Sequence, residues 1–574
     1  MSVMKKMGAI AAVATVGCGL LGTGFASAKA NSSSAAPVSV SMFETMPPGV
    51  VNMNTNWVTK YVEKKFNMNI NWNLVQTSDV TSKENVLVES GNYPDVFFDG
   101  SFTTLQALQY GKEGIFKPLN SLIKKYAPNV WHAIQTNAAF RAATVAPDGN
   151  IYGLPYYNVC THCNWQYKMW INGYYLKKFH LSLPTTTTQF EHVLEVLKQH
   201  NITPLTGYTG GWNSNPVPFL MDAFIYDDNT DYFDVNHGKI TFAPIQPGWR
   251  AGLEYMHQLY EKGLLSANVF TQTYAQAQKL AAKNQVGVLP GGTANVAFPG
   301  TAGVPWKYWM NAVPPLKGPH GVQYATFAGA NVEPSTICFA ITNKASEAQS
   351  IAVMKLVNWL YTFKGLQTAN YGPEGGQFWH YAKKGQKGLS GQQAYAFINN
   401  AAFSVTNQNL EWNQNFPMYQ DLYERNNSGV ATSAFDAQGS QSLLQLVTEE
   451  EYAGHQPAQV YPSAVWMSPT VGQQYSLEQT NINNYVTTWE TNFIFGRKSL
   501  TTDWNQYVQG FQGLGLQQYL ATAQKYMGAP LSTKPFQQDM KSVKYLLSLP
   551  EPTKYLQWVF QLPQYAKYES WKKH

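Results

Sequence analysis

The sequence predicts a mixed α/β protein with two lobes, and two observations indicate this class. Segments with the alternating polarity of strands recur between segments with the apolar spacing of helices, on both sides of the middle of the chain. The length of 574 residues exceeds what one hydrophobic core usually accommodates. Because strands alternate with helices, we expect two α/β lobes and not one large sheet.

The first expected element is a strand at residues 38–45 (VSVSMFET), where apolar and polar side chains alternate. Residues 68–75 (MNINWNLV) alternate in the same way and predict a second strand. Residues 54–67 lie between them and carry apolar side chains at helical spacing: Trp57, Val58, Tyr61, Val62 and Phe66. This order predicts a parallel pair of strands joined by a right-handed helical crossover.

Three further elements follow from the same patterns. Residues 84–90 (ENVLVES) predict a helix that ends near Gly91, and residues 95–98 (DVFF) predict a short buried strand. Residues 285–292 (QVGVLPGG) predict a strand that runs into a glycine turn.

Two later helices have clear ends. One carries a single apolar face and should stop at Gly263, since glycine adopts the left-handed conformation that ends many helices. That face consists of Trp249, Leu253, Met256 and Leu259. The other helix lies within residues 345–362, and Ser346 is a suitable N-terminal cap.

The N-terminus is typical of an export signal. Lys5 and Lys6 precede an apolar run, and residues 26–28 (ASA) fit a small-residue cleavage site. We expect residues 1–28 to be removed and residues 29–37 to form a flexible spacer. Cys18 offers an alternative, a lipid anchor, although its preceding residues match a lipoprotein signal poorly. No later segment has the apolar length of a membrane span.

The composition restricts the function classes. No dense block of Lys and Arg is present, so nucleic acid is not an expected partner. Charged residues make up 13% of the chain, against about 25% in an average protein. Such a surface has few carboxylates to neutralise at low pH. We therefore hypothesise an exported protein suited to an acidic medium.

Several segments of the sequence occur in the order and spacing that are typical of one protein family. They are residues 89–100 (ESGNYPDVFFDG), 114–129, 146–157 (APDGNIYGLPYY), 170–198, 237–265, 371–379 (YGPEGGQFW) and 483–527. They resemble extracellular solute-binding protein family 1 of ABC importers, in its long carbohydrate-binding branch common in Bacillus-like bacteria. The resemblance covers nearly the whole chain after the export signal, and no single phrase is diagnostic.

The resemblance implies a two-lobed periplasmic-binding-protein fold, with a ligand cleft and a hinge between the lobes. It implies lobe 1 at residues 38–158, with part of 325–400 returning to it, and lobe 2 at 159–324, with much of 401–574 added. The first crossing should fall near residues 153–164. The implied protein is a monomer at the cell surface or outside it, without a cofactor, and its partners are a carbohydrate and a membrane permease.

Aromatic residues make up 14% of the chain, and flat rings suit the apolar faces of sugars. Trp165 and Trp170 should lie on opposite faces of the strand after the crossing, so at most one of them contacts ligand. Trp212, in a loop rich in Gly and Asn, and Trp306 are further candidate platforms. For every one of these tryptophans the alternative is burial in a core.

Two acidic residues are carried over from the family pattern as ligand contacts. Asp95 stands at the start of the predicted strand of residues 95–98 and could accept sugar hydroxyls, or it could be a turn or cap acid. Glu374 lies beside glycines in residues 371–379 and could hold a ligand hydroxyl or fix a loop.

Other functions have weaker support. Common phosphate-loop, zinc-protease and serine-hydrolase motifs are absent from the sequence. An exported glycoside hydrolase, with two carboxyls beside the scissile bond, remains an alternative, as does capture of peptides or another polar solute. Asp227, Asn229 and Asp231 begin like a calcium loop, but Tyr232 replaces its glycine and Gly238 its closing glutamate. A polar loop is the alternative there, and no metal site is expected.

Cys160 and Cys163 form a Cys-x-x-Cys pair around His162. Asn164 follows, where haem attachment would require histidine, and the four ligands of a zinc site are not at hand. A thioredoxin-like pair begins a helix, whereas this pair is expected to precede a strand. Two interpretations are left: a disulfide that stiffens the hinge, or two packed, reduced thiols. No catalytic residue is assigned.

Overall fold

The computed structural model describes residues 36–549 except residues 48, 210–211, 294–310, 330–333, 335, 400–407, 434–439 and 537–538. The predicted export signal, most of the spacer and Trp306 lie outside the described residues. The described residues from Val38 onward belong to one compact unit, which contains two large sheets and two large hydrophobic cores.

The first sheet has the order β2-β1-β3-β13-β4, and β5 also pairs with β13. Its strands are β1 (Val38–Thr45), β2 (Met68–Val75), β3 (Val96–Phe97), β4 (Phe102–Thr103), β5 (Leu154–Pro155) and β13 (Thr336–Ile341). β1 runs parallel to β2 and β3, whereas β13 is antiparallel to β3. The predicted β-α-β unit is therefore present, with α1 (Trp57–Phe66) between its strands.

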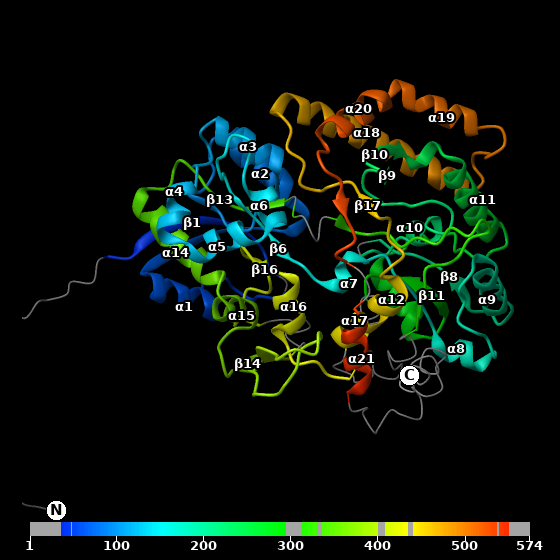
Figure 1. Cartoon of the computed structure of the whole chain (residues 1–574), viewed down its shortest axis with the longest axis horizontal. Helices are drawn as coiled ribbons and strands as arrows, with labels where there is room; N and C mark the ends of the chain where they lie inside the picture. The colour runs from blue at the N-terminus through cyan, green and yellow to red at the C-terminus, as the bar shows by residue number, and fades with distance from the viewer. Residues whose placement is uncertain are drawn as a thin grey trace, which may run out of the picture. The chain divides into compact units, whose positions relative to one another are not determined.

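Helices and a large apolar core accompany this sheet (Figure 1). They are α2 (Val80–Glu89), α3 (Thr104–Lys112), α4 (Asn120–Tyr126), α5 (Pro128–Thr136), α6 (Ala138–Thr144), α14 (Glu347–Leu360) and α15 (Phe363–Tyr371). Ser346 caps α14, as predicted, because its side chain accepts the Gln349 backbone N–H while the Gln349 side chain accepts the Ser346 N–H.

The second sheet has the order β12-β7-β11-β8. Its strands are β7 (Met169–Ile171), β8 (Thr203–Leu205), β11 (Val286–Pro290) and β12 (Asn311–Val313). The helices between them are α8 (Gly173–Lys178), α9 (Thr187–Gln199), α10 (Val217–Met221), α11 (Pro247–Glu261) and α12 (Tyr274–Ala282). The predicted face of α11 is fully buried, and Gly263 follows its end with a φ of 64°.

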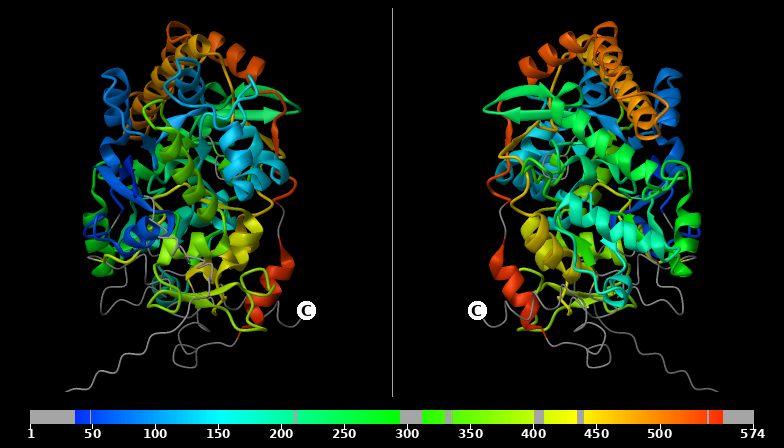
Figure 2. Two further views of the ribbon diagram at one scale, coloured as in Figure 1. Left: turned by 90° about the vertical axis from the view of Figure 1, so that its left-hand side faces the viewer. Right: turned by 90° about the vertical axis from the view of Figure 1, so that its right-hand side faces the viewer.

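The C-terminal elements divide between two places (Figures 1 and 2). The helices α18 (Pro469–Ile494), α19 (Trp504–Gly513) and α20 (Leu516–Tyr526) pack near α11 and the hairpin of β9 (Phe233–Asn236) and β10 (Lys239–Phe242). By contrast, α21 (Met540–Ser548) packs on α17 (Ser440–Val447) and the π-helical turn Thr448–Tyr452. All these helices contribute to the second core.

Short elements connect the two cores. β6 (Tyr157–Asn158) pairs with β16 (Tyr419–Gln420), and α7 (Thr161–Asn164) precedes β7. A hairpin of β14 (Trp379–Tyr381) and β15 (Ala396–Ile398) is followed by α16 (Leu422–Ser428), and β17 (Gln459–Val460) pairs with β18 (Leu531–Ser532). The chain thus passes from the first sheet to the second between β5 and β7.

Residues 408–420 contribute to the first core. Trp412, Phe416 and Met418 are fully buried there, whereas much of 401–574 was expected to join the second lobe. The Trp412 Nε1–H donates to Thr59 Oγ1 on α1 at 3.0 Å, which fixes the segment on the first sheet's side. Within the described part of the chain, no helix has both the length and the apolar character of a membrane span.

Candidate functional site

Acidic side chains gather where the first strands of the sheet end. Glu44 is the penultimate residue of β1, and Asp99 lies two residues beyond β3. β1 and β3 are parallel neighbours, so these residues share the carboxyl edge, where open α/β sheets bind ligands. The Asp99 Oδ2 accepts a hydrogen bond from Asn415 Nδ2 at 3.0 Å, and Thr45 Oγ1 donates to the Asp99 carbonyl at 3.0 Å.

The carboxyl groups of this edge have raised pKa values. Glu44 is fully buried, and neither of its carboxyl oxygens has a hydrogen-bond partner among the described residues. Burial raises the pKa of Glu44 well above its ordinary value, and the nearby charge of Asp99 raises it further. Burial also raises the pKa of Asp99 to about 6 and that of Glu84 to about 7. Such a carboxyl can donate a hydrogen bond when protonated and accept one when ionised.

A polar network continues from this edge toward the crossing. The Tyr156 hydroxyl donates to Gln414 Oε1 at 3.4 Å, and Asn158 Nδ2 donates to the Tyr156 hydroxyl at 3.3 Å. The Oδ1 of Asn158 has no partner among the described residues although it is buried. Gln414 precedes Asn415 in the sequence, so amide and hydroxyl groups extend from the residue that contacts Asp99 to the segment that carries the cysteines.

The crossing segment is tied into one rigid turn. Cys160 and Cys163 are joined in a disulfide, and His162 Nε2 lies 3.6 Å from Cys160 Sγ. Lys168 is fully buried; its ammonium donates to the His162 carbonyl at 3.1 Å and to the Trp165 carbonyl. Burial lowers the pKa of Lys168 to about 7, and burial with the charges of Lys168 and Arg425 lowers the pKa of His162.

The surroundings of the cysteines correct one expectation. The pair does not directly precede a strand, because Cys160 stands at the N-cap position of the four-residue helix α7 and β7 begins only at Met169. Cys160, His162 and Cys163 are also the only described group of three or more side chains placed close enough to share a metal ion. Because the two sulfurs are bonded to each other, they offer no thiolates to a metal.

Two of the predicted platforms belong to the second core. Trp165 and Trp170 are 2% and 0% exposed, and the Trp170 Nε1–H donates to the Gly291 carbonyl at 2.8 Å. Trp165 packs edge-on against Phe327, with 5.3 Å between ring centroids. Neither ring presents a face to a ligand in this structure. Their assignment to opposite faces of one strand is also wrong, because the strand does not extend back to Trp165.

Trp212 has the exposure that a platform requires. Its side chain is 36% exposed, and its Nε1–H donates to Gln166 Oε1 at 3.2 Å. The His162 ring meets it edge-on at 6.3 Å, which places Trp212 beside the disulfide. A Cβ atom at Gly292 would overlap the Trp212 ring, so a glycine is required beneath it.

The two acids carried over from the family pattern have protein partners. The Asp95 Oδ2 accepts from the Ser41 backbone N–H and hydroxyl, both at 2.8 Å, and from Gln349 Nε2 at 3.0 Å. This carboxylate ties β1 to the start of α14, at the sheet edge opposite to Asp99. Glu374 pairs with Lys364 at 2.7 Å on a half-exposed surface, which matches the alternative of fixing a loop.

The loop that begins like a calcium site uses its acids differently. Asp227 Oδ1 accepts the Asn229 backbone N–H at 2.8 Å, and Asp231 Oδ1 accepts the Tyr519 hydroxyl at 3.2 Å. The described acids of this loop therefore do not converge on one point. The loop joins α10 to β9 and closes on its own backbone.

Glu44, Asp99 and Asn415 are not among the site residues predicted from the sequence. One feature of the sequence could have indicated Glu44, because the alternation of residues 38–45 places it on the same face as Val40 and Met42. A carboxyl on the buried face of a strand needs a partner or a function. No local pattern could have indicated Asn415, because its partner Asp99 lies 316 residues away in the sequence.

Comparison with known proteins agrees with this fold. A profile of the bacterial extracellular solute-binding proteins matches residues 54–366. The fructooligosaccharide ABC transporter substrate-binding protein FusA of Streptococcus pneumoniae is 25% identical over 505 residues, which cover 84% of this chain and 89% of FusA. The structure of FusA with kestose has a TM-score of 0.71 at 21% identity, covering 85% of this chain and 98% of FusA.

A second solved structure is a solute-binding protein from Bifidobacterium longum infantis that binds HMO and is associated with an ABC transporter. It has a TM-score of 0.68 at 20% identity and covers 85% of this chain and 98% of its own. These structures establish the two-lobed periplasmic-binding-protein fold. Because the family profile spans more than half of the sequence, the chain belongs to the bacterial extracellular solute-binding protein family, which is non-enzymatic.

Proposed function

We propose that this protein captures an extracellular oligosaccharide and delivers it to the permease of an ABC importer by closure of its two lobes. The family supports solute capture, and the names of the relatives support a saccharide. The observation that carries the proposal is the acidic edge. Among the described residues, the buried carboxyl of Glu44 has no hydrogen-bond partner, and it lies near Asp99, which binds the amide of Asn415.

A sugar would satisfy this edge in chemical terms. Its hydroxyls both donate and accept hydrogen bonds, so they complement carboxyls and amides, while its C–H faces stack on an aromatic ring. Trp212 offers such a ring beside the crossing. We propose Glu44, Asp99, Asn415 and Trp212 as ligand contacts, and assign Asp95 and Glu374 to the framework.

The boundaries and location are part of the proposal. Lobe 1 would comprise residues 38–158 with β13 to α15 and residues 408–420, and lobe 2 most of the remaining described chain, as the two cores suggest. The protein would be exported, with residues 1–28 removed or Cys18 lipidated, and would act as a monomer. Mass spectrometry of the mature N-terminus distinguishes cleavage from lipidation.

Calorimetric titration tests the function directly. The wild type should bind kestose or another oligosaccharide from a panel in a saturable manner and release no reducing ends. Glu44→Leu should weaken that binding about 10- to 100-fold, because leucine has a similar size but can neither donate nor accept the hydrogen bonds of a sugar hydroxyl. The control Glu89→Leu changes an exposed carboxyl of α2 and should bind like wild type. Binding of peptides alone, or an unaltered affinity of a folded Glu44→Leu variant, would refute the assignment.

A further inference from the structure

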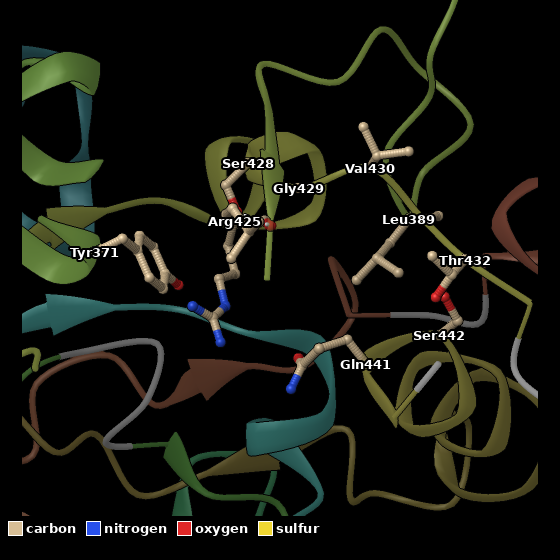
Figure 3. Close-up of a pocket in the computed structure, with 11 residues that line it drawn as sticks. Tyr371, Leu389, Arg425, Ser428, Gly429, Val430, Thr432, Gln441 and Ser442 are labelled. Carbon is tan, nitrogen blue, oxygen red and sulfur yellow. Dashed lines mark hydrogen bonds between the residues drawn. The ribbon is translucent and has the colours of Figure 1, made fainter. Parts of the chain in front are cut away.

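A pocket lies beside the crossing, between elements of both cores (Figure 3). Its wall includes Tyr371 at the end of α15, Arg425 of α16, Thr432, and Gln441 and Ser442 from the first turn of α17. Leu389 and Ala431, which also line it, pack with the second core, whereas Tyr371 packs with Phe378 and Trp379. The pocket therefore joins parts of the chain that belong to different cores.

Arg425 has a guanidinium without a compensating partner among the residues that the structure describes. In the described part of the chain, its guanidinium forms no ion pair, hydrogen bond or ring contact that would compensate it, although the residue is half-buried. Figure 3 shows the guanidinium reaching from α16 toward the Tyr371 ring and Gln441. The other three arginines have partners: Arg141 donates to the Ile134 carbonyl, Arg250 pairs with Glu254, and Arg497 lies over Phe495.

The acids nearest in sequence do not supply the missing charge. The Asp421 carboxylate accepts the Glu424 backbone N–H at 2.8 Å and caps α16. Burial, followed by the charge of Asp421, raises the pKa of Glu424 to about 7. Burial raises the pKa of Tyr156 and Tyr371 to about 12, and the charge of Arg425 opposes this rise. Burial and the charge of Lys168 lower the pKa of His162, and the charge of Arg425 adds to that effect.

A half-buried guanidinium without a compensating charge is suited to binding a carboxylate group. Its N–H donors form a planar fork that binds a carboxylate through two parallel hydrogen bonds. The hydroxyls of Thr432 and Ser442 and the amide of Gln441 add polar groups to the same wall. We propose that this pocket binds the carboxylate of an acidic sugar residue, so that the captured oligosaccharide contains a uronic acid.

The location of the pocket connects it with the proposed ligand site. Asn426, next to Arg425 on α16, donates to Thr161 Oγ1 of the crossing at 3.4 Å. The charges of Arg425 and Asp99 both act on the pKa of Tyr156, so the two charged groups lie near the same side chain. One oligosaccharide can thus contact the acidic edge with neutral sugar units and Arg425 with a uronate. This inference rests on the proposed function and specifies its ligand.

The test compares acidic and neutral oligosaccharides of equal length. The wild type is titrated with trimers of galacturonate, mannuronate and glucuronate, with neutral trisaccharides that include kestose, and with sodium sulfate alone. At least one uronate trimer should bind more tightly than every neutral trimer, and added salt should weaken it. Arg425→Gln should weaken uronate binding about 10- to 100-fold and change neutral binding less than about twofold, because one charge-assisted contact is lost.

Two variants keep the result interpretable. Arg497→Gln removes an arginine that lies away from the pocket and should leave all affinities unchanged. Arg425→Lys keeps the charge but loses the fork, and should retain only part of the uronate affinity; a melting curve of each variant verifies folding. Neutral trimers that bind as tightly as uronates, or uronate binding unaltered by Arg425→Gln, would overturn this inference and leave the proposed function standing. Sulfate binding as tight as uronate binding would also overturn it, and a wild type that binds no saccharide at all would overturn both.

Discussion

Replacement of Glu490 by glutamine should stabilise the protein at pH 8 far more than at pH 5. Glu490 lies on α18 with 6% of its surface exposed, among the aromatic side chains of the second core. Burial raises its pKa from 4.5 to about 8. A buried carboxyl of this kind resists ionisation, because the charged form loses its hydration.

The sign of the effect follows from proton linkage. The folded protein holds the Glu490 proton more tightly than the unfolded chain, so the contribution to stability is complete below the ordinary pKa near 4.5 and is lost as pH rises to about 8. With a pKa near 4.5 unfolded and about 8 folded, the loss between pH 5 and pH 8 is about 3 kcal/mol. Glutamine has the same shape and cannot ionise, so Glu490→Gln should escape most of this loss.

Urea unfolding at pH 5 and pH 8 measures this difference for wild type, Glu490→Gln and the exposed control Glu89→Gln. The gain from Glu490→Gln should be larger at pH 8 by about 3 kcal/mol, whereas Glu89→Gln should show no such dependence. A gain that is equal at the two pH values would refute the reasoning, as would a wild type that is more stable at pH 8 than at pH 5.

Three further predictions concern the crossing and the sheet. Trp212→Ala should weaken oligosaccharide binding by about 1–3 kcal/mol in calorimetry if the ring stacks on a sugar; unchanged affinity in a folded variant removes it from the site. Cys160→Ser with Cys163→Ser should lower the free energy of unfolding by about 2 kcal/mol, the value for a short closed loop. A reductant should lower the melting temperature of the wild type and leave that of the double variant unchanged. Asp95→Asn should cost about 1–3 kcal/mol of stability and leave affinity unchanged, since its carboxylate serves β1 and α14; a selective loss of binding would place it in the site.

Local patterns predicted the elements that depend on local interactions. The β-α-β unit, the cap at Ser346 and the stop at Gly263 all follow from residues within a few positions of one another. Trp165 and Trp170 show where this reasoning fails. Alternation assumed an extended chain from Trp165 onward, but the disulfide and the Lys168 hydrogen bonds hold the preceding residues in a turn.

The candidate site depends on contacts that no local pattern contains. Asn415 reaches Asp99 across 316 positions, and the pocket at Arg425 combines residues from α15, α16 and α17. The aromatic content of the sequence suggested tryptophans as ligand contacts. Most large rings fill cores, however, because burial of apolar area dominates folding. Glu44 and Arg425, which have no compensating partner in the described part of the chain, are recognisable only once their neighbours are known.

Many other carboxyls share the direction of the Glu490 shift, which bears on the low charge of the sequence. Burial raises the pKa of Asp222 and Asp231 to about 7, and that of Glu411 to about 8. Each such group stabilises the fold most when it is protonated, so the contributions add in the same direction as pH falls. A surface with few charges limits repulsion in acid, and these buried carboxyls make acid favourable to the folded state. The two features together support the hypothesis of an exported protein suited to an acidic medium.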